Sequence, residues 1–559
     1  MTDKTEKKDA PSGKTTQPSK AKNDYRIPES SAWAGYWKIF AGVGVLGLAG
    51  AGFGYTQDPE RFAFSYLFAF FLFLTVAFGG TFFVLVERLT SAHWSVAVRR
   101  TAEFFMGGMP VFVILFIPVF LSMGHLFPWL HHGEHGAEHG AEHAAPAPAE
   151  KHSSLDSLDL IKEAHAQQPA PPSAAAAAPG APAPAPAPHP GAAVRDDGHG
   201  GGQGTGGGHG SGAGTGAHGG GTGTGTGGSH GQHSGTGGGT AAGDDGPARM
   251  AGSGGGHAAG VGGGEHMGKG RPDPLELAEE KSMAKKSAYL NKNAFLIRAV
   301  IYFAIWLFLA ARLFGFSTKQ DTSKDPKLTL AAQSFAPGGT ILFGLSLTFA
   351  AFDWLMSLNP GWYSTIFGVT IFAGSVVAIF ATLILVTMAL RDDGLLKDVL
   401  RVEHFHDMGK LLFGFMVFWA YVNFSQFMLI WYASLPEETV YFHLRWDVGP
   451  WKTMSLVIVI LHFVVPFFTI VSRNAKRRLS VLWTGAVVLL AMHAVEMYWI
   501  VMPNYKGGES GFEWIDAACF LGVGGLYLAL VFNRMTKHPL IPIGDPRLAR
   551  SLHHEIENA

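Results

Sequence analysis

The stretch FAFSYLFAFFLFLTVAFGGTFFVLV, residues Phe62–Val86, decides the fold class. It runs for 25 residues without a charged side chain. About 20 apolar residues in a helix are enough to cross the roughly 30 Å hydrocarbon core of a bilayer. Phe62–Val86 is therefore predicted to be a transmembrane helix, and the chain to be an integral membrane protein.

Nine further runs of the same kind lie along the 559-residue chain, each about as long and nearly free of charge. They predict an all-α polytopic membrane protein of about ten transmembrane helices. An even number of spans places both termini on one side of the membrane. The predicted spans are Trp33–Phe53, Phe62–Val86, Thr101–Met123, Phe295–Phe314, Ala336–Leu355, Thr365–Ala389, Leu411–Ser434, Thr453–Val471, Val481–Met502 and Ile515–Phe532.

Lysine and arginine are concentrated in alternate loops. The N-terminal tail, the loops after the even-numbered spans and the C-terminal tail are basic, as in RNAKRR at Arg473–Arg478. The intervening short loops carry few positive charges, and Asn359–Tyr363 carries none. Because basic loops stay in the cytoplasm, both termini are predicted to be cytoplasmic in a multi-pass topology.

One long segment interrupts the spans. Residues 131–272 are rich in Gly, Ala, Pro and His, with runs such as PAPAPAPHP and GGTGTGTGGSHG. Such a composition cannot bury enough apolar surface to offset chain entropy, so it predicts a disordered insertion, periplasmic because it follows the third span. Its histidines allow metal buffering or a solvated linker, and we favour the linker with no metal site because no spacing fixes a coordination geometry.

The predicted organisation has five parts. They are a disordered cytoplasmic tail at 1–30, helices one to three at 31–130, the insertion at 131–272, helices four to ten at 273–535, and a cytoplasmic tail at 536–559.

Composition excludes several function classes. The net charge of −1 gives no reason to expect nucleic acid as a partner. The single cysteine, Cys519, excludes a disulfide framework and an iron–sulfur ligand set within this chain. The sequence also lacks a CxxCH motif for covalently attached haem. Because of the predicted spans, the lipid bilayer is the first expected partner.

Ionisable residues inside spans are costly, so they are functional candidates. Buried carboxylates and imidazoles can titrate near working pH, which favours a proton route, although each group could instead pair across helices and fix packing. A cluster before the seventh span would take protons up at the cytoplasmic side, although we favour a solvated helix start there. The proton-path candidates are Asp353, His404, His406, Asp407, Lys410, His462, His493 and Glu496, and the cluster also contains Glu403.

A haem interpretation is weaker. His462 and His493 lie on different predicted helices and could form an axial pair. The chain lacks the pattern of two histidines per helix expected for stacked haems. We therefore do not predict a haem in this chain.

Four separated blocks closely resemble one family. These are FVLVERLTSAHWSVAVRRTAEF (Phe83–Phe104), KKSAYLNKNAFLIRAVIYFAIW (Lys285–Trp306), FAAFDWLMSLNPGWYSTIFG (Phe349–Gly368) and HDMGKLLFGFMVFWAYVNFSQFMLIWYASLPEET (His406–Thr439). They resemble the ActF subunits of alternative complex III, a quinol:cytochrome c oxidoreductase, within the NrfD/polysulfide-reductase family of membrane subunits. The resemblance covers essentially all spans and none of the insertion.

The resemblance implies a fold, a location and partners. It implies two four-helix bundles, the second to fifth and the sixth to ninth spans, flanked by the first and last helices in a bacterial inner membrane. It also implies a sister membrane subunit of the same fold, a periplasmic iron–sulfur protein and c-type cytochromes, with a terminal oxidase as a further candidate partner. Haem and iron–sulfur groups would belong to those partners.

The implied function is that of an oxidoreductase subunit without a bound redox cofactor of its own. Quinol would be oxidised near the periplasmic face, and proton translocation is a further expectation. His462, His493 and Glu496 lie outside the four blocks, so their proposed role rests on burial alone. The candidates for quinone binding at the periplasmic face are Trp354, Gln426, Glu437 and Glu438.

Two other classes remain open. A secondary transporter would use broken helices and a mid-membrane site, and Pro118 and Pro466 could break helices. A purely structural anchor of a complex would make no use of the buried ionisable groups.

Overall fold

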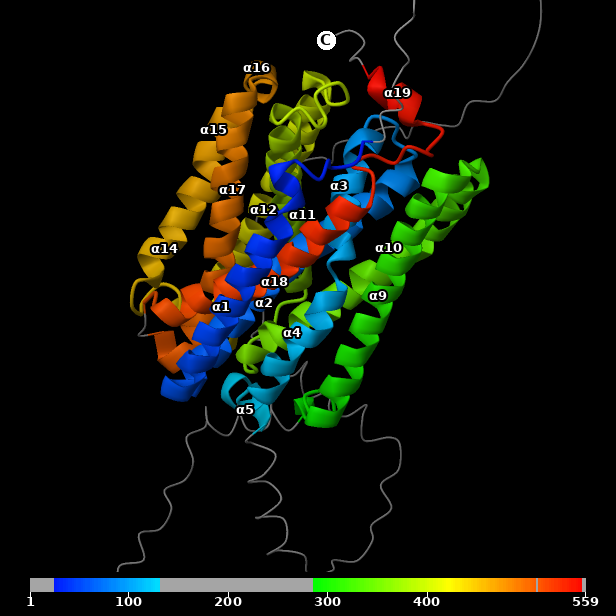
Figure 1. The fold of residues 1–559 in the computed structure, drawn as a ribbon. Coiled ribbons are helices and arrows are strands. Elements are labelled where there is room, and N and C mark those ends of the chain that lie inside the picture. The colour runs from blue at the N-terminus through cyan, green and yellow to red at the C-terminus, as the bar shows by residue number, and fades with distance from the viewer. Residues whose placement is uncertain (1–24, 131–284, 509–510, 555–559) are drawn as a thin grey trace, which may run out of the picture. The chain divides into compact units, whose positions relative to one another are not determined.

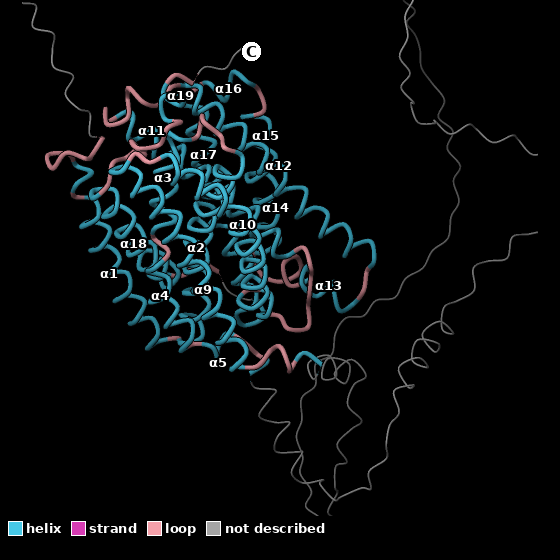
Figure 2. The backbone as a smooth tube through the Cα atoms, turned by 90° about the vertical axis from the view of Figure 1, so that its right-hand side faces the viewer, coloured by secondary structure: helices cyan, strands magenta, loops and turns pink. Residues whose placement is uncertain are grey.

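Among the residues that the computed structural model describes, ten helices are long and apolar enough to cross a membrane (Figure 1). The structure describes residues 25–130, 285–508 and 511–554. Within these ranges the chain is helical with connecting loops and contains no strand (Figure 2). The predicted all-α polytopic fold is confirmed. The insertion predicted at 131–272 and most of the tail predicted at 1–30 lie outside the described residues.

Five of the ten spans end before Leu355. They are α1 (Tyr36–Gln57), α2 (Pro59–Thr90), α3 with α4 (Val96–Gly107 and Pro110–Leu121), α9 (Lys292–Ser323) and α10 (Pro326–Trp354). Short helices precede α1 and follow α4 and α10, at η1 (Ala32–Ala34), α5 (Met123–Leu126) and η2 (Met356–Leu358).

The other five spans follow, from Phe367 onward. They are α11 (Phe367–Asp392), α12 (Val402–Ala433), α14 with η3 and α15 (Trp451–Ile458, Val459–Val464 and Val465–Ile470), α17 (Leu479–Val501) and α18 (Trp514–Lys537). Shorter helices join or follow them, at α13 (Pro436–His443), α16 (Arg473–Arg477), η4 (Met502–Gly508) and α19 (Leu548–Leu552).

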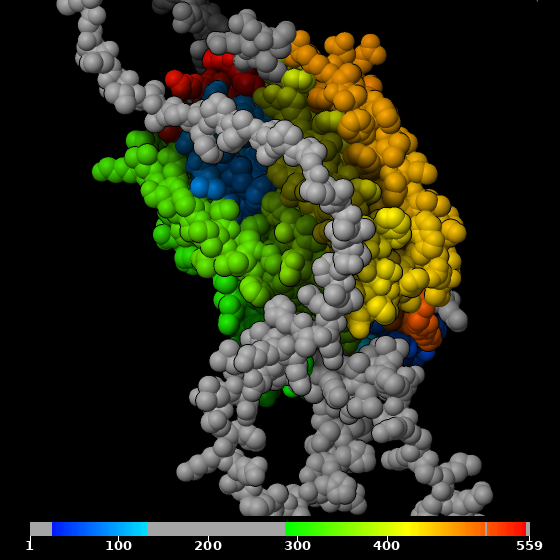
Figure 3. Space-filling model, turned by 180° about the vertical axis from the view of Figure 1, so that it is seen from behind, coloured from blue at the N-terminus to red at the C-terminus, as the bar shows by residue number. Residues whose placement is uncertain are grey.

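Two bundles meet along α2. This helix is buried along most of its length and packs on α3, α10, α11, α17 and α18. The first bundle consists of α2, α3–α4, α9 and α10, and the second of α11, α12, α14–α15 and α17. Figure 3 shows α9 and α10 in green on one flank and the later helices in yellow to orange on the other. The expected pair of four-helix bundles is confirmed.

Helices α1 and α18 pack against each other through glycines. A Cβ atom at Gly44 would stand 2.7 Å from the backbone nitrogen of Leu526, and one at Gly47 would overlap the backbone of Gly522. Small residues let membrane helices approach this closely. The opposite face of α1 exposes Leu46 and Phe53, as expected for a flanking helix that meets lipid.

The first and the last described residues lie near the same end of the helices. The Leu540 amide donates a hydrogen bond to the Tyr25 carbonyl at 2.8 Å, and α19 lies at the same end as α16 (Figure 1). We call this the terminal end, and the other the opposite end. The helices extend beyond the predicted spans, and α12 begins at Val402 rather than Leu411.

Candidate functional site

A chain of buried polar side chains joins the two bundles within the spans. His493 and Glu496 lie one turn apart on α17, and the His493 side chain is fully buried. His493 Nδ1 is 3.2 Å from Glu496 Oε2. The indole Nε1 of Trp419, on α12, donates a hydrogen bond to Glu496 Oε1 at 2.6 Å. The carboxyl group is therefore fixed from two helices.

The first bundle contributes Thr75 of α2. Its hydroxyl donates to the Leu72 carbonyl at 2.6 Å and lies 2.8 Å from His493 Nε2. His493 therefore contacts a hydroxyl group through Nε2 and a carboxyl group through Nδ1, and it links Thr75 of the first bundle to Glu496 of the second.

His462 completes the site from the eighth span. Its side chain is fully buried, and neither ring nitrogen has a hydrogen-bond partner among the described residues. The ring stacks on Trp419 with centroids 4.0 Å apart, and Nδ1 lies 3.9 Å from Glu496 Oε2. An unpaired buried imidazole is unfavourable, so this position fits a proton acceptor or a group that meets water transiently.

The backbone around His462 explains its placement. Residues Val459–Val464 form a π-helical turn, η3, between α14 and α15. Pro466 has no amide proton to donate to the carbonyl of His462, four residues earlier. Single π turns inside α-helices occur frequently at functional sites.

Gly374 of α11 makes room for the site. A Cβ atom there would stand 3.0 Å from His493 Cε1 and 3.2 Å from Glu496 Oε2. Among the described residues no group of three His, Cys, Asp or Glu side chains could hold a metal ion. Both nitrogens of His493 contact protein atoms, which also weakens the haem alternative.

Asp353 lies apart from this site, near the opposite end of α10. Its buried carboxylate accepts from Arg298 at 2.8 and 3.0 Å and from the Tyr302 hydroxyl at 2.7 Å. Trp354 is fully buried against aromatic rings such as Phe116. Three donors saturate Asp353, so its contacts fit helix packing better than proton transfer.

The remaining candidates at the opposite end are dispersed. Gln426 Oε1 accepts from the Ser364 hydroxyl at 3.1 Å. Glu437 is exposed and Glu438 half-buried in the first turn of α13. Near Asp353, a groove of about 310 Å³ runs between the segment that precedes α9 and the end of α10, and its lining includes Lys286, Phe349, Phe352, Met356, Trp362 and Tyr363.

His404, His406 and Asp407 at the start of α12 are buried, which corrects the expectation of a solvated helix start, whereas Lys410 is half exposed. His404 is fully buried, and its Nε2 lies 3.0 Å from the Ser551 carbonyl. Asp407 contacts Lys410 at 2.6 Å and His554 at 2.7 Å. The segment after α18 folds back over these side chains, and nothing in the local sequence signals that long-range contact.

His406 and Glu403 belong to the same cluster. His406 Nδ1 is 3.9 Å from Asp407 Oδ1, and Glu403 accepts from Arg477 at 2.9 Å. The described structure does not join this cluster to the buried site. From Asp407 to Trp419 along α12 the rise is about 18 Å.

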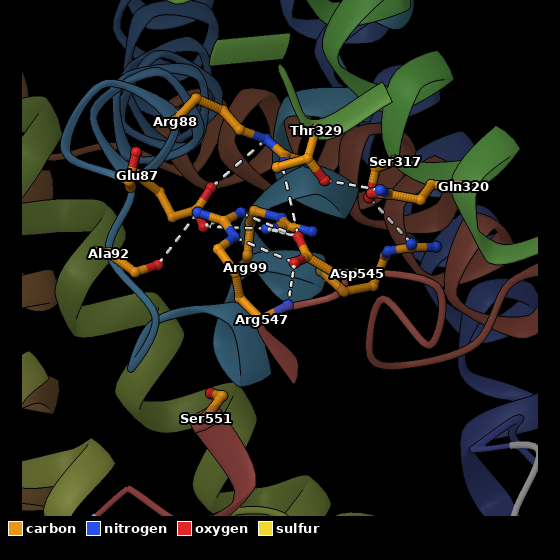
Figure 4. A network of polar contacts seen from close by, with 12 residues as sticks. Glu87, Arg88, Ala92, Arg99, Ser317, Gln320, Thr329, Asp545, Arg547 and Ser551 are labelled. Atoms are coloured by element: carbon orange, nitrogen blue, oxygen red, sulfur yellow. Dashed lines mark hydrogen bonds and ion pairs between the residues drawn. The ribbon is translucent and has the colours of Figure 1, made fainter. Parts of the chain in front are cut away.

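Sequence reasoning missed a buried network of charges at the terminal end (Figure 4). Arg99 pairs with Glu87 at 3.0 Å, with Glu103 at 3.0 Å and with Asp545 at 2.8 Å. Burial alone would raise the pKa of Asp545, but Arg99 and Arg547 outweigh it and hold that pKa below its usual value. The network consists of four cations and four carboxylates, namely Arg88, Arg99, Arg100, Arg547, Glu87, Glu103, Asp321 and Asp545.

Sequence reasoning also missed Thr75, Trp419 and Gly374, the uncharged members of the buried site. Threonine, tryptophan and glycine are common in membrane helices, so only the geometry identifies them. Comparison with known proteins adds no further assignment: no family model and no curated protein matches this chain.

Proposed function

We propose that this chain is an integral membrane subunit of a respiratory quinol:cytochrome c oxidoreductase of the alternative complex III type. Its task in that complex would be to carry protons through the buried site formed by Thr75, Trp419, His462, His493 and Glu496. The four sequence blocks support the complex. The observation that carries the proton role is the fully buried His462, which has no hydrogen bond among the described residues and lies 3.9 Å from the Glu496 carboxyl group that contacts His493 at 3.2 Å.

The proposed route begins at the terminal end, which the basic loops assign to the cytoplasm. There Asp407, His554 and Lys410 form a titratable cluster at the water boundary. Water would bridge the distance from this cluster to Trp419. Glu496 and His493 would hold the proton, and His462 would accept it from Glu496 when the η3 turn rearranges.

A quinone role is a separate part of the proposal. The groove beside Asp353 has the volume of a small ligand pocket. Aromatic side chains such as Phe352 and Trp362 would pack on a quinone ring, and the groove lies at the end assigned to the periplasm. Electrons would leave through a periplasmic iron–sulfur protein and c-type cytochromes, since one cysteine cannot bind a cluster. The sister membrane subunit and a terminal oxidase complete the proposed set of partners.

The experiment isolates the protein from native membranes in mild detergent and reconstitutes the sample into vesicles. We expect co-isolated c-type cytochromes, quinol-dependent cytochrome reduction and proton movement coupled to turnover. Glu496→Gln should reduce the protons moved per electron several-fold while the complex stays assembled. The control is Glu60→Gln, because Glu60 lies in the first turn of α2, outside the site.

Two outcomes would redirect the proposal. If Glu496→Gln moved as many protons as wild type, the chain would be a structural anchor of the complex rather than a proton carrier. A lone, colourless protein would favour a secondary transporter, which the π turn and Pro466 within the eighth span also fit, because transporters bind substrates at broken helices.

A further inference from the structure

A groove on the outer surface of the second bundle lies just below the α16 turn. Helices α15 and α17 enclose about 280 Å³ there. The lining comes from Val465, Pro466 and Thr469 on α15 and from Val481, Thr484 and Val488 on α17. Figure 1 shows α16 at the terminal end, directly above both helices. The groove therefore begins at a turn at one membrane boundary and runs into the span.

The walls of this groove are apolar although they include hydroxyl residues. Thr469 donates its hydroxyl proton to the Pro466 carbonyl at 3.1 Å, and Thr484 donates to the Ser480 carbonyl at 3.0 Å. Gly485 contributes no side chain, and a Cβ atom there would come within 3.0 Å of Ile470. Hydrocarbon is the chemistry that such a surface fits inside a bilayer.

The turn above the groove is strongly basic, with four cationic residues in Arg473–Arg478. Two of them have partners: Lys476 donates to the Ile470 and Val471 carbonyls at 2.7 and 2.6 Å, and Arg477 pairs with Glu403 at 2.9 Å. Arg473 and Arg478 are exposed, and neither forms an ion pair with another described residue. Both belong to the segment that joins α15 to α17: Arg473 comes four residues after Thr469 and Arg478 two residues before Ser480, and Thr469 and Ser480 line the groove.

We propose that this groove binds an anionic phospholipid, with one acyl chain between α15 and α17 and the phosphate between Arg473 and Arg478. Guanidinium groups bind phosphate through charge-assisted hydrogen bonds, and basic pockets between membrane helices on the cytoplasmic side bind anionic lipid headgroups. Topology alone requires positive charge in this loop. It does not require an apolar groove that ends between two unpaired arginines.

The test uses the full chain in vesicles that contain a phosphatidylglycerol with a photoactivatable group on its acyl chain. After illumination, labelled peptides are mapped by mass spectrometry. We expect label on residues 465–488 and little on α9 and α10. The double variant Arg473→Gln/Arg478→Gln should lower labelling of 465–488 about tenfold or more. The matched control is Lys319→Gln/Lys327→Gln, two exposed cations at the same end of the molecule and away from the groove.

A second variant tests the groove separately from the two arginines. Thr484→Trp keeps both arginines but fills the groove, and it should also reduce labelling of 465–488. Excess inorganic phosphate should not compete, whereas a phosphatidylcholine probe should label this region less. Equal labelling by the two lipids, or unchanged labelling in both variants, would overturn the proposal. Cross-linking of 465–488 to another polypeptide in native membranes would also overturn it, because the groove would then be a protein interface.

Discussion

Gly374 sets how closely α11 approaches the buried His493–Glu496 pair. In Gly374→Ala the new methyl group would stand within 3.2 Å of both side chains, so the pair must move by a few tenths of an ångström. A small misplacement of reacting groups costs large factors in rate, and we expect proton movement per electron to fall about tenfold. The measurement is proton release from vesicles during quinol oxidation.

The control for this change is Gly344→Ala on α10. No atom lies within 4 Å of a Cβ at Gly344, so this variant should behave as wild type. Equal activity of the two glycine variants would show that the pair tolerates displacement and is not the proton-carrying group.

Thr75 tests whether the contact between the bundles matters for proton movement. Thr75→Val keeps the side-chain shape but removes the hydroxyl group that lies 2.8 Å from His493 Nε2. The imidazole ring then loses the contact that orients it, and we expect proton movement per electron to fall several-fold. Thr75→Ser keeps the hydroxyl group and should behave as wild type. Equal proton movement in Thr75→Val and Thr75→Ser would show that this contact is not part of the proton route.

For single residues, the sequence identifies the ionisable members of the site but not the side chains that they contact. His462, His493 and Glu496 stand out because charge inside a span is rare, and the structure brings all three together. Asp353 stands out for the same reason, yet it is paired with Arg298, 55 residues away in sequence. Pairing between distant helices depends on packing, which periodicity does not encode.

Helix α1 depends on α18 for its place beside α2. The contact is built from glycines, and a methyl group at Gly47 would overlap the Gly522 backbone. Gly47→Ala should therefore lower the midpoint of thermal unfolding in detergent, with an overpacking cost of about 1–3 kcal/mol. Gly42→Ala on the same helix meets no atom within 4 Å and should leave the midpoint unchanged. Similar midpoints for the two variants would mean that α1 can shift outward at little cost.

The predicted spans have the right number and order, but each helix extends beyond its predicted span at one end or at both. Hydropathy marks only the part of a helix that lies in hydrocarbon, whereas α9 continues to Ser323 and α12 starts at Val402. The π turn η3 is not predictable either. Pro466 signals a break in the helix, but the position of the π turn at Val459–Val464 is visible only in the structure.

At the scale of the whole molecule, the segment after α18 ties both bundles together at the terminal end. Asp545 reaches Arg99 at the start of α3 and Arg88 at the end of α2 (Figure 4). Ser551 and His554 reach His404 and Asp407 at the start of α12. This segment is polar and lies beyond the last span, so its sequence predicts only a cytoplasmic tail.

Replacing Asp545 measures how much its ion pairs stabilise the folded chain. It is 4% exposed, and Asp545→Asn leaves the buried cations Arg88 and Arg99 short of one negative charge. Removing one partner of a buried ion pair costs about 3–5 kcal/mol, so the variant should unfold at a clearly lower temperature. The control is Asp398→Asn, which changes an exposed aspartate at the same end and should unfold at the wild-type temperature.

The pH dependence separates lost charge from lost packing. Because the pKa of Asp545 is lowered in the folded state, its stabilising contribution is fully present above the unfolded pKa of about 3.9 and declines as pH falls toward the folded value. The difference in unfolding temperature between wild type and Asp545→Asn should therefore be constant from pH 8 to 5 and shrink below about pH 4. A difference that persists unchanged under acid would show that Asp545 acts through shape and hydrogen bonds rather than through its charge.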